Sequence, residues 1–318
     1  MRAVTYESYG PLENLTLCDV SAPAPGPGEL VVDVLRAALN PKDSFFRKGR
    51  FALISGRTFP KRSGADFAGI VRTSRSPHFA AGDRVFGALD EWTFRRGTLA
   101  DQVCVTDQEA ARLPAGVSYD DAAAIALTGL TALQALRDIA KVEHGARVWI
   151  HGASGGVGTV AIQIARLLGA EVTTTSSAAN LALCTDLGAR LALDYRAEPV
   201  SRLRGTVDVV FDVFGDLISR EVASVFDKRG VFISTVPTAK RLVLDVTTRL
   251  SRVQRRLVVV KPRRADLTQL GTWLANGELR AVIDSRFPIA QVHDAFRRLE
   301  SKRTRGKIIV ELKDDDES

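Results

Sequence analysis

The chain has 318 residues, of which 45% are hydrophobic, enough to bury the cores of two domains. Its N-terminus, Met1–Tyr6, lacks the long apolar core of a signal peptide, and no apolar stretch approaches the roughly 18 residues that span a bilayer. Three widely separated cysteines exclude a disulfide framework and a Cys-x-x-Cys metal lobe. These features predict a cytoplasmic protein without a transmembrane segment.

The chain is basic, with a formal net charge of +7 and a pI near 9.5. Basic residues are densest from Arg249 to Arg264, where Leu250, Val253 and Leu257 recur at spacings of three and four. This pattern predicts an amphipathic helix with a solvated charged side; the alternative is a surface for an acidic partner or a phosphorylated substrate. No aromatic and basic motif typical of nucleic-acid binding accompanies the charge, so no nucleic-acid partner is expected.

The first part of the chain, up to about residue 120, contains short strand patterns separated by turn residues. Regularly spaced short strands of this kind predict a small β-barrel or sandwich. The predicted strands are Leu30–Leu35, Ala68–Arg72, Asp83–Phe86 and Asp101–Val105.

From about Asp120 the pattern changes to long apolar segments at helical spacing that alternate with buried strands. This alternation predicts a parallel sheet covered on both faces. After a helix that begins at Asp120, the predicted segments are the strand Arg147–Ile150, the helix Gly158–Leu168, the strand Glu171–Thr175, the helix Leu181–Leu187, and the strands Ala192–Asp194, Val207–Phe211 and Gly230–Thr235.

The last part of the chain is expected to return to the first domain. Its predicted segments are a helix at Leu267–Leu274, a strand at Ala281–Ile283, a helix at Gln291–Leu299 and a closing strand at Gly306–Leu312. The acidic tip Asp314–Ser318 is expected to be disordered. The chain is therefore predicted to be an α/β protein, with one domain formed by residues 1–120 and 259–318 and a doubly wound parallel-sheet domain formed by residues 121–258.

A glycine loop joins the strand Arg147–Ile150 to the following helix and carries the pattern Ala153-x-Gly155-x-x-Gly158. A dinucleotide pyrophosphate needs backbone N–H groups at a helix N-terminus and no side chain in the way, which glycines at this turn supply. Because the pattern lies between an apolar strand and an apolar helix, it predicts dinucleotide binding rather than a structural turn.

The end of the second strand distinguishes the two nicotinamide cofactors. NAD-binding chains usually place an acidic residue there for the ribose 2′-hydroxyl. Here the strand ends in Thr175-Ser-Ser-Ala-Ala-Asn180, whose hydroxyls and amide can bind a 2′-phosphate that a carboxylate would repel. The sequence therefore favours NADPH, although this turn holds no lysine or arginine.

The motifs together resemble the zinc-free quinone-oxidoreductase branch of the medium-chain dehydrogenase/reductase superfamily over essentially the whole chain, and within it the chloroplast-envelope and 2-alkenal reductase members. The matching segments, beside the glycine loop, are Asn40–Asp43, Gly64–Gly69, Gly82–Val85, Leu127–Ala132, Leu193–Tyr195, Asp212–Gly215 and Arg305–Ile309. The resemblance implies a GroES-like β-barrel substrate domain and a Rossmann cofactor domain, with the active site in the cleft that separates them.

The resemblance also implies a metal-free reaction. Zinc-dependent members have a cysteine where this chain has Asn40, and a Gly-His-Glu motif where it has Gly64-Ala-Asp66. Because both metal-ligating side chains are missing, no metal is expected. The implied reaction is hydride transfer from NADPH to a small apolar substrate, either the activated C=C of an α,β-unsaturated carbonyl or a quinone.

The residues implied for catalysis follow from the same comparison. Enoyl-reductase members carry a tyrosine as proton donor where this chain has Phe51, and often a second tyrosine where it has Phe45, so both are expected to line an apolar pocket. Either bulk water or Lys42, which stands where zinc-dependent relatives have a catalytic hydroxyl, must then supply the proton, and water is favoured. Asn40 is expected to bind the substrate carbonyl or the ribose, or else only to cap a turn.

The resemblance implies a set of cofactor contacts. The pyrophosphate is expected at the loop, the 2′-phosphate at the end of the second strand, and the nicotinamide beside Thr128; relatives often have an arginine where this chain has Ala179, for which Arg196 could compensate. The expected contact residues are Thr128, Ala153, Ser154, Gly155, Gly156, Val157, Ser177, Asn180, Tyr195, Val213 and Thr235.

Two other functions stay open from the sequence. The first is an enoyl thioester reductase acting on coenzyme A or carrier-protein substrates, with the basic stretch Arg249 to Arg264 as the phosphate-binding surface. The second is a non-catalytic NADPH-binding protein of the crystallin kind. Relatives commonly dimerise through an edge strand of the Rossmann sheet, for which Val231–Thr235 is the candidate.

Overall fold

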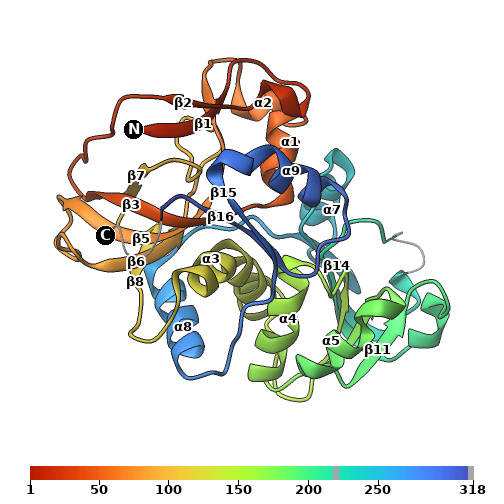
Figure 1. Ribbon diagram of the computed structural model, residues 1–318. Coiled ribbons are helices and arrows are strands. Elements are labelled where there is room, and N and C mark those ends of the chain that lie inside the picture. The colour runs from red at the N-terminus through yellow and green to blue at the C-terminus, as the bar shows by residue number, and fades with distance from the viewer. Residues whose placement is uncertain (218–221, 314–318) are drawn as a thin grey trace. The chain divides into compact units, whose positions relative to one another are not determined.

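The computed structural model describes residues 1–217 and 222–313 (Figure 1). The chain forms two units, one made of Met1–Leu127 with Lys261–Ser318 and the other of Thr128–Val260. The predicted tip Asp314–Ser318 lies outside the described residues.

The first unit is built on largely antiparallel sheets. Its main sheet has the order β15-β16-β3-β5-β6-β8, with β7 paired to β3, and a second sheet has the order β2-β1-β4. The strands are β1 (Arg2–Tyr6), β2 (Thr16–Asp19), β3 (Glu29–Ala38), β4 (Lys61–Arg62), β5 (Asp66–Ser74), β6 (Arg84–Ala88), β7 (Gln102–Thr106), β8 (Ala110–Arg112), β15 (Ile283–Pro288) and β16 (Lys307–Glu311). All four strands predicted in this part are confirmed.

Helices α1 (Pro41–Arg47), α2 (Ala52–Ser55), α8 (Arg264–Ala275) and α9 (Val292–Glu300) belong to the same unit. As predicted, the C-terminal strand β16 returns to this unit, where it pairs with both β15 and β3. The strand predicted at Ala281–Ile283 is wrong in position, because β15 extends from Ile283 to Pro288. β15 is an edge strand, so its polar residues face solvent on one side and give no apolar signal in the sequence.

The second unit contains a six-stranded, all-parallel sheet in the order β11-β10-β9-β12-β13-β14. Counted along the chain this is the order 3-2-1-4-5-6 of a doubly wound dinucleotide-binding fold. Its strands are β9 (Arg147–His151), β10 (Glu171–Ser176), β11 (Leu191–Asp194), β12 (Val207–Asp212), β13 (Phe226–Ser234) and β14 (Val253–Leu257). Its helices include α4 (Gly156–Leu167), α5 (Leu181–Asp186) and α7 (Ala239–Thr247), and α3 (Tyr119–Leu133) leads into it from the first unit.

Two predictions about the end of this sheet are wrong. The stretch from Arg249 to Arg264 does not form one amphipathic helix, because Val253–Leu257 is the strand β14. Parallel pairing with β13 outweighs the local helical spacing, and the Arg252 guanidinium bonds the backbone carbonyls of Asp227 and Lys228. The segment Val231–Thr235 is not at the sheet edge, because β13 pairs with β12 on one side and with β14 on the other.

A further correction concerns membrane-spanning length. The continuous helical stretch Tyr119–Ile139, which joins α3 to the π-helical turn Gln134–Ile139, is long and apolar enough to cross a membrane. However, 78% of its apolar window is buried inside the protein, as in the core helix of a globular fold.

Candidate active site

The glycine loop lies at the carboxyl end of β9, where α4 begins. Gly155 is the N-cap of α4, and Gly156 is its first residue. The first N–H groups of a helix have no acceptor within the helix, so they are available to an anion. The structure thus places Gly155, Gly156 and Val157 at the N-terminus of α4, and the Ala153 side chain is buried.

Three of the four glycines of the loop, Gly152, Gly155 and Gly158, differ in why glycine stands there. At Gly158 it would lie 2.5 Å from the Gly152 carbonyl oxygen, and Gly152 itself has a φ of +77°. These two glycines are required by the fold. At Gly155 the nearest atom would be 3.6 Å away and φ is −81°, so the fold itself does not demand glycine there. A glycine that the packing does not require, at a helix N-terminus, fits close approach of a pyrophosphate.

A polar cluster forms at the carboxyl end of β10. The Asn180 amide donates to the hydroxyls of Ser154, at 3.0 Å, and Ser177, at 3.1 Å. The structure therefore joins three predicted contacts, two of which are 26 residues apart, in one half-buried group that holds no carboxylate. Such a group can accept and donate hydrogen bonds to a phosphate without repelling it.

Tyr195 and Arg196 lie next to this cluster. The Tyr195 backbone N–H donates to the Ser176 carbonyl at 3.2 Å, which brings the end of β11 to the end of β10. The Arg196 guanidinium lies over the Tyr195 ring, 5.5 Å from its centroid. Arg196 thus places a cation near the end of β10, where the segment Thr175–Asn180 itself has no lysine or arginine.

Val213 and Thr235 are also brought together, at the ends of β12 and β13. The Thr235 hydroxyl donates to the Val213 carbonyl at 2.8 Å, and the Val213 N–H donates to the His151 carbonyl at 3.0 Å. These residues therefore lie at the same sheet edge as the glycine loop, whereas Thr128 is buried in α3.

His151 forms a network that the sequence did not reveal. Its Nδ1 lies 2.8 Å from the Thr175 hydroxyl, which also accepts from the Trp149 indole, and its Nε2 lies 2.8 Å from Asp216 Oδ1. Because a carboxylate only accepts, Nε2 donates to Asp216, and in the neutral imidazole Nδ1 then accepts from the Thr175 hydroxyl. Strand pairing, not sequence spacing, creates this network.

His151, Asp212 and Asp216 offer three ligand atoms within 4.8 Å of one another. The buried Asp212 carboxylate already accepts from the Gly215 N–H at 2.7 Å and pairs with Arg241 at 3.1 Å. A guanidinium this close repels a divalent cation. We therefore interpret these contacts as holding the turn that follows β12, and not as a metal site.

In the first unit, Asn40, Asp66 and Lys307 form a buried network. The Lys307 ammonium donates to Asn40 Oδ1 at 2.7 Å, to Asp66 Oδ2 at 3.2 Å and to the Leu39 carbonyl at 2.8 Å. The Asn40 amide nitrogen donates to Asp66 Oδ2 at 2.5 Å, and Asp66 Oδ1 accepts from the Leu127 N–H. An ammonium only donates and a carboxylate only accepts, so these partners fix the orientation of the amide.

Asn40 is also the N-cap of α1. Its backbone N–H donates to Asp43 Oδ2 at 2.8 Å, and Pro41 occupies the first helical position, where the missing N–H costs nothing. Asp43 is fully buried, and burial raises its pKa to about 6. The amide and backbone of Asn40 are therefore both engaged within the protein, which makes it an organising residue of this region.

Lys42 lies within an aromatic cluster. Its ammonium is 4.9 Å from the ring centroid of Trp92, 5.6 Å from that of Phe94 and 5.9 Å from that of Phe46. Phe51 packs on Phe46, at 5.1 Å between centroids. Phe45 joins the same cluster through Phe51, at 6.4 Å, so the two predicted pocket phenylalanines and Lys42 lie together.

Asp66 and Lys307 carried no predicted role, although they stand in the motifs Gly64–Gly69 and Arg305–Ile309. Trp92 and Phe94 carried no signal, because the loop that brings them to Lys42 is held by ion pairs of Arg96 with Glu91 and Glu109. Those contacts depend on the tertiary fold.

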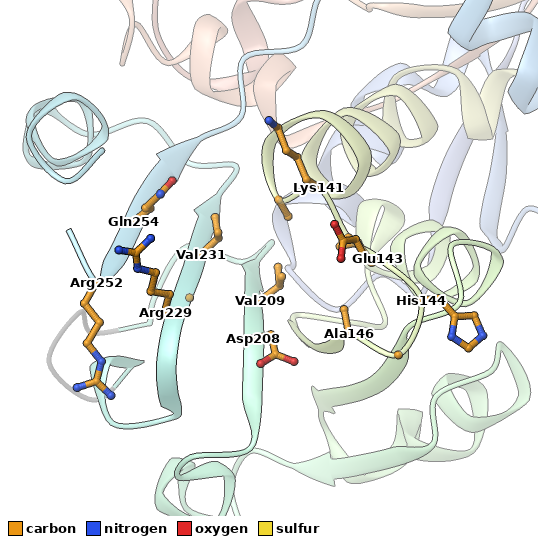
Figure 2. Close-up of a pocket in the computed structure, with 14 residues that line it drawn as sticks. Lys141, Glu143, His144, Ala146, Asp208, Val209, Arg229, Val231, Arg252 and Gln254 are labelled. Atoms are coloured by element: carbon orange, nitrogen blue, oxygen red, sulfur yellow. The ribbon is translucent and has the colours of Figure 1, made fainter. Parts of the chain in front are cut away.

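A cavity of about 440 Å³ in the second unit is a different feature (Figure 2). It is lined by Lys141 and Glu143 before β9, by Asp208 of β12, and by Arg229 and Arg252 near β13 and β14. This is the amino-terminal edge of the parallel sheet, opposite to the glycine loop. Because open parallel sheets bind cofactors at the carboxyl ends of their strands, we do not assign the cofactor to this cavity.

Comparison with known proteins agrees with this architecture. The family model "Alcohol dehydrogenase GroES-like domain" matches residues 26–115, and the model "Zinc-binding dehydrogenase" matches residues 187–310. The chain is 30% identical to the chloroplast envelope quinone oxidoreductase homolog of Arabidopsis thaliana, over 98% of each chain. It is 32% identical to the trans-enoyl reductase pgmF of Aspergillus terreus, over 98% of this chain and 96% of that protein.

Among solved structures, the quinone oxidoreductase from Coxiella burnetii matches with a TM-score of 0.90 and 28% identity, over 98% of this chain and 99% of that one. Fold, glycine loop and relatives together define an NAD(P)H-dependent reductase with a GroES-like domain and a Rossmann domain. The chain belongs to the medium-chain dehydrogenase/reductase superfamily, in its zinc-free quinone-oxidoreductase branch.

The name of the second family model implies zinc, but the residues present do not fit this ion. The two positions that correspond to zinc ligands in the resemblance hold Asn40 and the Ala65–Asp66 pair. Asn40 and Asp66 both bond the Lys307 ammonium, which carries the positive charge that a metal would bring. A divalent cation placed among the same donors would be repelled by that ammonium and would find no imidazole or thiolate.

Proposed function

We propose that this protein is an NADPH-dependent reductase of the activated C=C bond of α,β-unsaturated carbonyls, or of quinones, that works without a metal. The observation that carries the proposal is the Asn40–Asp66–Lys307 network, which occupies the positions of the zinc ligands. A substrate in this protein must therefore accept hydride through its own conjugated carbonyl. Enones and quinones do so, and simple ketones do not.

NADPH supplies a hydride from C4 of its nicotinamide. The protein's own groups do the rest: the N-terminus of α4 binds the pyrophosphate, and the cluster of Ser154, Ser177 and Asn180 binds the 2′-phosphate. Phe45 and Phe51 provide an apolar surface for the substrate, which keeps water from the reacting carbon. Asn40 holds the start of α1, and with it Lys42, in place.

The decisive experiment compares acceptors. Purified protein is expected to oxidise NADPH with small enals or 1,4-quinones, and to leave simple ketones and alcohols unchanged in either direction. Adding zinc or a chelator should not change the rate. Cofactor binding without turnover of any acceptor would refute the enzyme assignment and leave the crystallin-like, non-catalytic function.

The preference for NADPH is tested separately. Asn180→Asp places a carboxylate beside Ser154 and Ser177, where it would repel the 2′-phosphate and accept from a ribose hydroxyl. We expect the ratio of kcat/KM for NADPH over NADH to fall at least tenfold, with stability unchanged. Arg196→Ala should lower the same ratio by a smaller factor, and an unaltered ratio in both variants would contradict this placement of the 2′-phosphate.

An enoyl thioester reductase is the second candidate, favoured by the identity to a trans-enoyl reductase. Crotonyl-CoA in the same acceptor comparison distinguishes it. The basic stretch proposed for the thioester phosphates does not form one surface helix, because it contains β14 and an extended connection to α8. This arrangement and the phenylalanine at position 51 favour small free enals or quinones.

Two general properties complete the proposal. We place the protein in the cytoplasm, and we expect a homodimer that pairs one of the two edge strands of the parallel sheet. That strand is β14, Val253–Leu257.

A further inference from the structure

The charge of Lys42 has no polar partner in the described part of the chain. Within residues 1–217 and 222–313, no carboxylate, carbonyl or hydroxyl oxygen lies within hydrogen-bond or ion-pair distance of its ammonium nitrogen, which instead faces the rings of Phe46, Trp92 and Phe94. The faces of aromatic rings attract a cation, but they offer no lone-pair acceptor for its N–H groups. All three N–H donors of Lys42 are therefore free for a ligand oxygen.

The surroundings also make the proton of Lys42 easier to release. Burial lowers its pKa from the ordinary value, and the nearby carboxylates of Asp43, Asp90, Glu91 and Asp66 act in the opposite direction. A lysine shifted in this direction loses a proton to an enolate or phenolate more readily than a solvated one.

The aromatic cage is prearranged. Phe46 follows Lys42 by one helical turn in α1, and Phe46 stacks on Phe94 at 4.3 Å between centroids. The Glu91 carboxylate accepts from the backbone N–H groups of Thr93 and Phe94, which fixes the loop that carries both further rings. The ammonium position is thus set before any substrate binds.

The cage adjoins the position where a proton donor is missing. Phe51 stands where enoyl-reductase relatives have their tyrosine, and its ring packs on Phe46, one of the three rings against Lys42. An ammonium and a phenol can both donate a hydrogen bond to a substrate oxygen. The Lys42 ammonium can therefore take the place of the tyrosine hydroxyl that is missing at Phe51.

We propose that Lys42 is the proton donor of the reaction, in place of bulk water. This inference rests on the proposed function. Hydride from NADPH forms the new C–H bond at the β-carbon, and the C=C electron pair moves to give an enolate. The Lys42 N–H then gives its proton to that enolate, so the substrate gains one hydride and one proton, NADP⁺ is released, and the neutral amine takes a proton from solvent.

The test compares Lys42→Met and Lys42→Arg with Lys48→Met as a control, since Lys48 is an exposed cation at the end of the same helix. In Lys42→Met we expect kcat to fall about 10²–10⁴-fold, as for loss of a general acid. Lys42→Arg keeps the charge but cannot release a proton at neutral pH, so it should lose nearly as much. Lys48→Met should match the wild type.

Two further readouts separate donation from a structural role. A general acid must be protonated, so wild-type kcat should decline as pH rises through the Lys42 pKa, and this decline should be absent in Lys42→Met. Without cofactor, p-nitrophenolate should bind the wild type and Lys48→Met but at least tenfold more weakly to Lys42→Met, while NADPH affinity and thermal unfolding stay unchanged.

The failures are distinguishable. A wild type that reduces no acceptor defeats the proposed function. An active wild type with Lys42→Met within threefold of its kcat and with the same pH profile, or with Lys42→Arg fully active, defeats only the assignment of Lys42.

Discussion

The contrast between the buried Lys307 and the half-buried Lys42 defines the chemistry of the first unit at the scale of single residues. Lys307 has all three N–H groups bonded, to Asn40, Asp66 and the Leu39 carbonyl, and its role is therefore structural. Lys42 lies against aromatic rings and has no such acceptor among the residues that the structure describes. A satisfied ammonium organises its surroundings, and an unsatisfied one is available to a ligand.

The role of Lys307 gives a stability prediction. Lys307→Met removes a charge that is 5% exposed and leaves the buried Asp66 carboxylate without its cation. We expect the free energy of unfolding to fall by about 3–5 kcal/mol, measured by urea denaturation. The matched variant Lys228→Met, at an exposed position, should change it by less than about 0.5 kcal/mol. A loss below about 1 kcal/mol for Lys307→Met would contradict the network.

Asp43 gives a prediction about pH. Burial raises its pKa from 3.8 to about 6, so between these values the folded protein binds the proton more tightly than the unfolded chain does. Stability should therefore increase as pH falls through about 6 and decrease as pH rises through it. The groups that face this carboxyl include Lys42, Asp66 and Lys307.

Asp43→Asn keeps a side-chain oxygen for the Asn40 N–H and removes the titration. Unfolding at pH 4.5 and pH 8 should show the wild type losing stability relative to the variant as pH rises, by about 2 kcal/mol. A difference that does not vary with pH would show that Asp43 does not titrate in this range.

At the scale of elements, some helices and strands are determined by their own residues and others by the strands with which they pair. The β9–loop–α4 element follows from its own residues, because an apolar strand, a glycine turn and an apolar helix each form where the pattern predicts. β14 does not follow from its own residues, because Val253–Leu257 is an edge strand whose charged residues give no apolar strand pattern. Its strand conformation comes from pairing with β13.

The glycine loop gives a prediction at this scale, using two alanine variants of one element. Gly158→Ala would place a Cβ 2.5 Å from the Gly152 oxygen and should destabilise the protein by about 1–3 kcal/mol. Gly155→Ala meets nothing closer than 3.6 Å and should leave stability within about 1 kcal/mol, yet weaken NADPH binding at least tenfold. Thermal unfolding and fluorescence titration with NADPH measure the two effects. Unweakened NADPH binding by Gly155→Ala would exclude this loop as the pyrophosphate site.

At the scale of the whole molecule, each unit has its own hydrophobic core. One core is centred on Val32, Phe67 and Phe296, and the other on Trp149, Val210 and Phe232. The first core takes residues from both ends of the chain, since α9 and β16 pack with strands from the first hundred residues. The C-terminal segment is therefore an integral part of the core of the first unit.

Assembly is predicted at this scale too. The chain has a mass of 34.5 kDa, and light scattering should give twice this value if two copies pair through β14. Amide hydrogen exchange in β14 should then slow as concentration rises, whereas exchange in β11, the opposite edge of the sheet, should not change. A mass of 34.5 kDa at high micromolar concentration would exclude the dimer.

The sequence by itself determined the α/β class, the glycine loop and nearly every strand of the parallel sheet, because these depend on local periodicity and on glycines at fixed positions. It also brought Phe45, Phe51 and Lys42 to attention, through one short motif and its neighbours. It could not determine which side chains meet, because Lys307 is 267 residues from Asn40 and 241 from Asp66.

Only the tertiary structure decided how the charges are distributed. In the folded chain, Lys307 bonds both Asn40 and Asp66, Lys42 faces three aromatic rings, and β14 rather than β13 is the edge strand of the sheet. The physical reason is common to all three: the energy of a charge or of an unpaired strand depends on its neighbours in space, and sequence periodicity carries no information about contacts made across the fold.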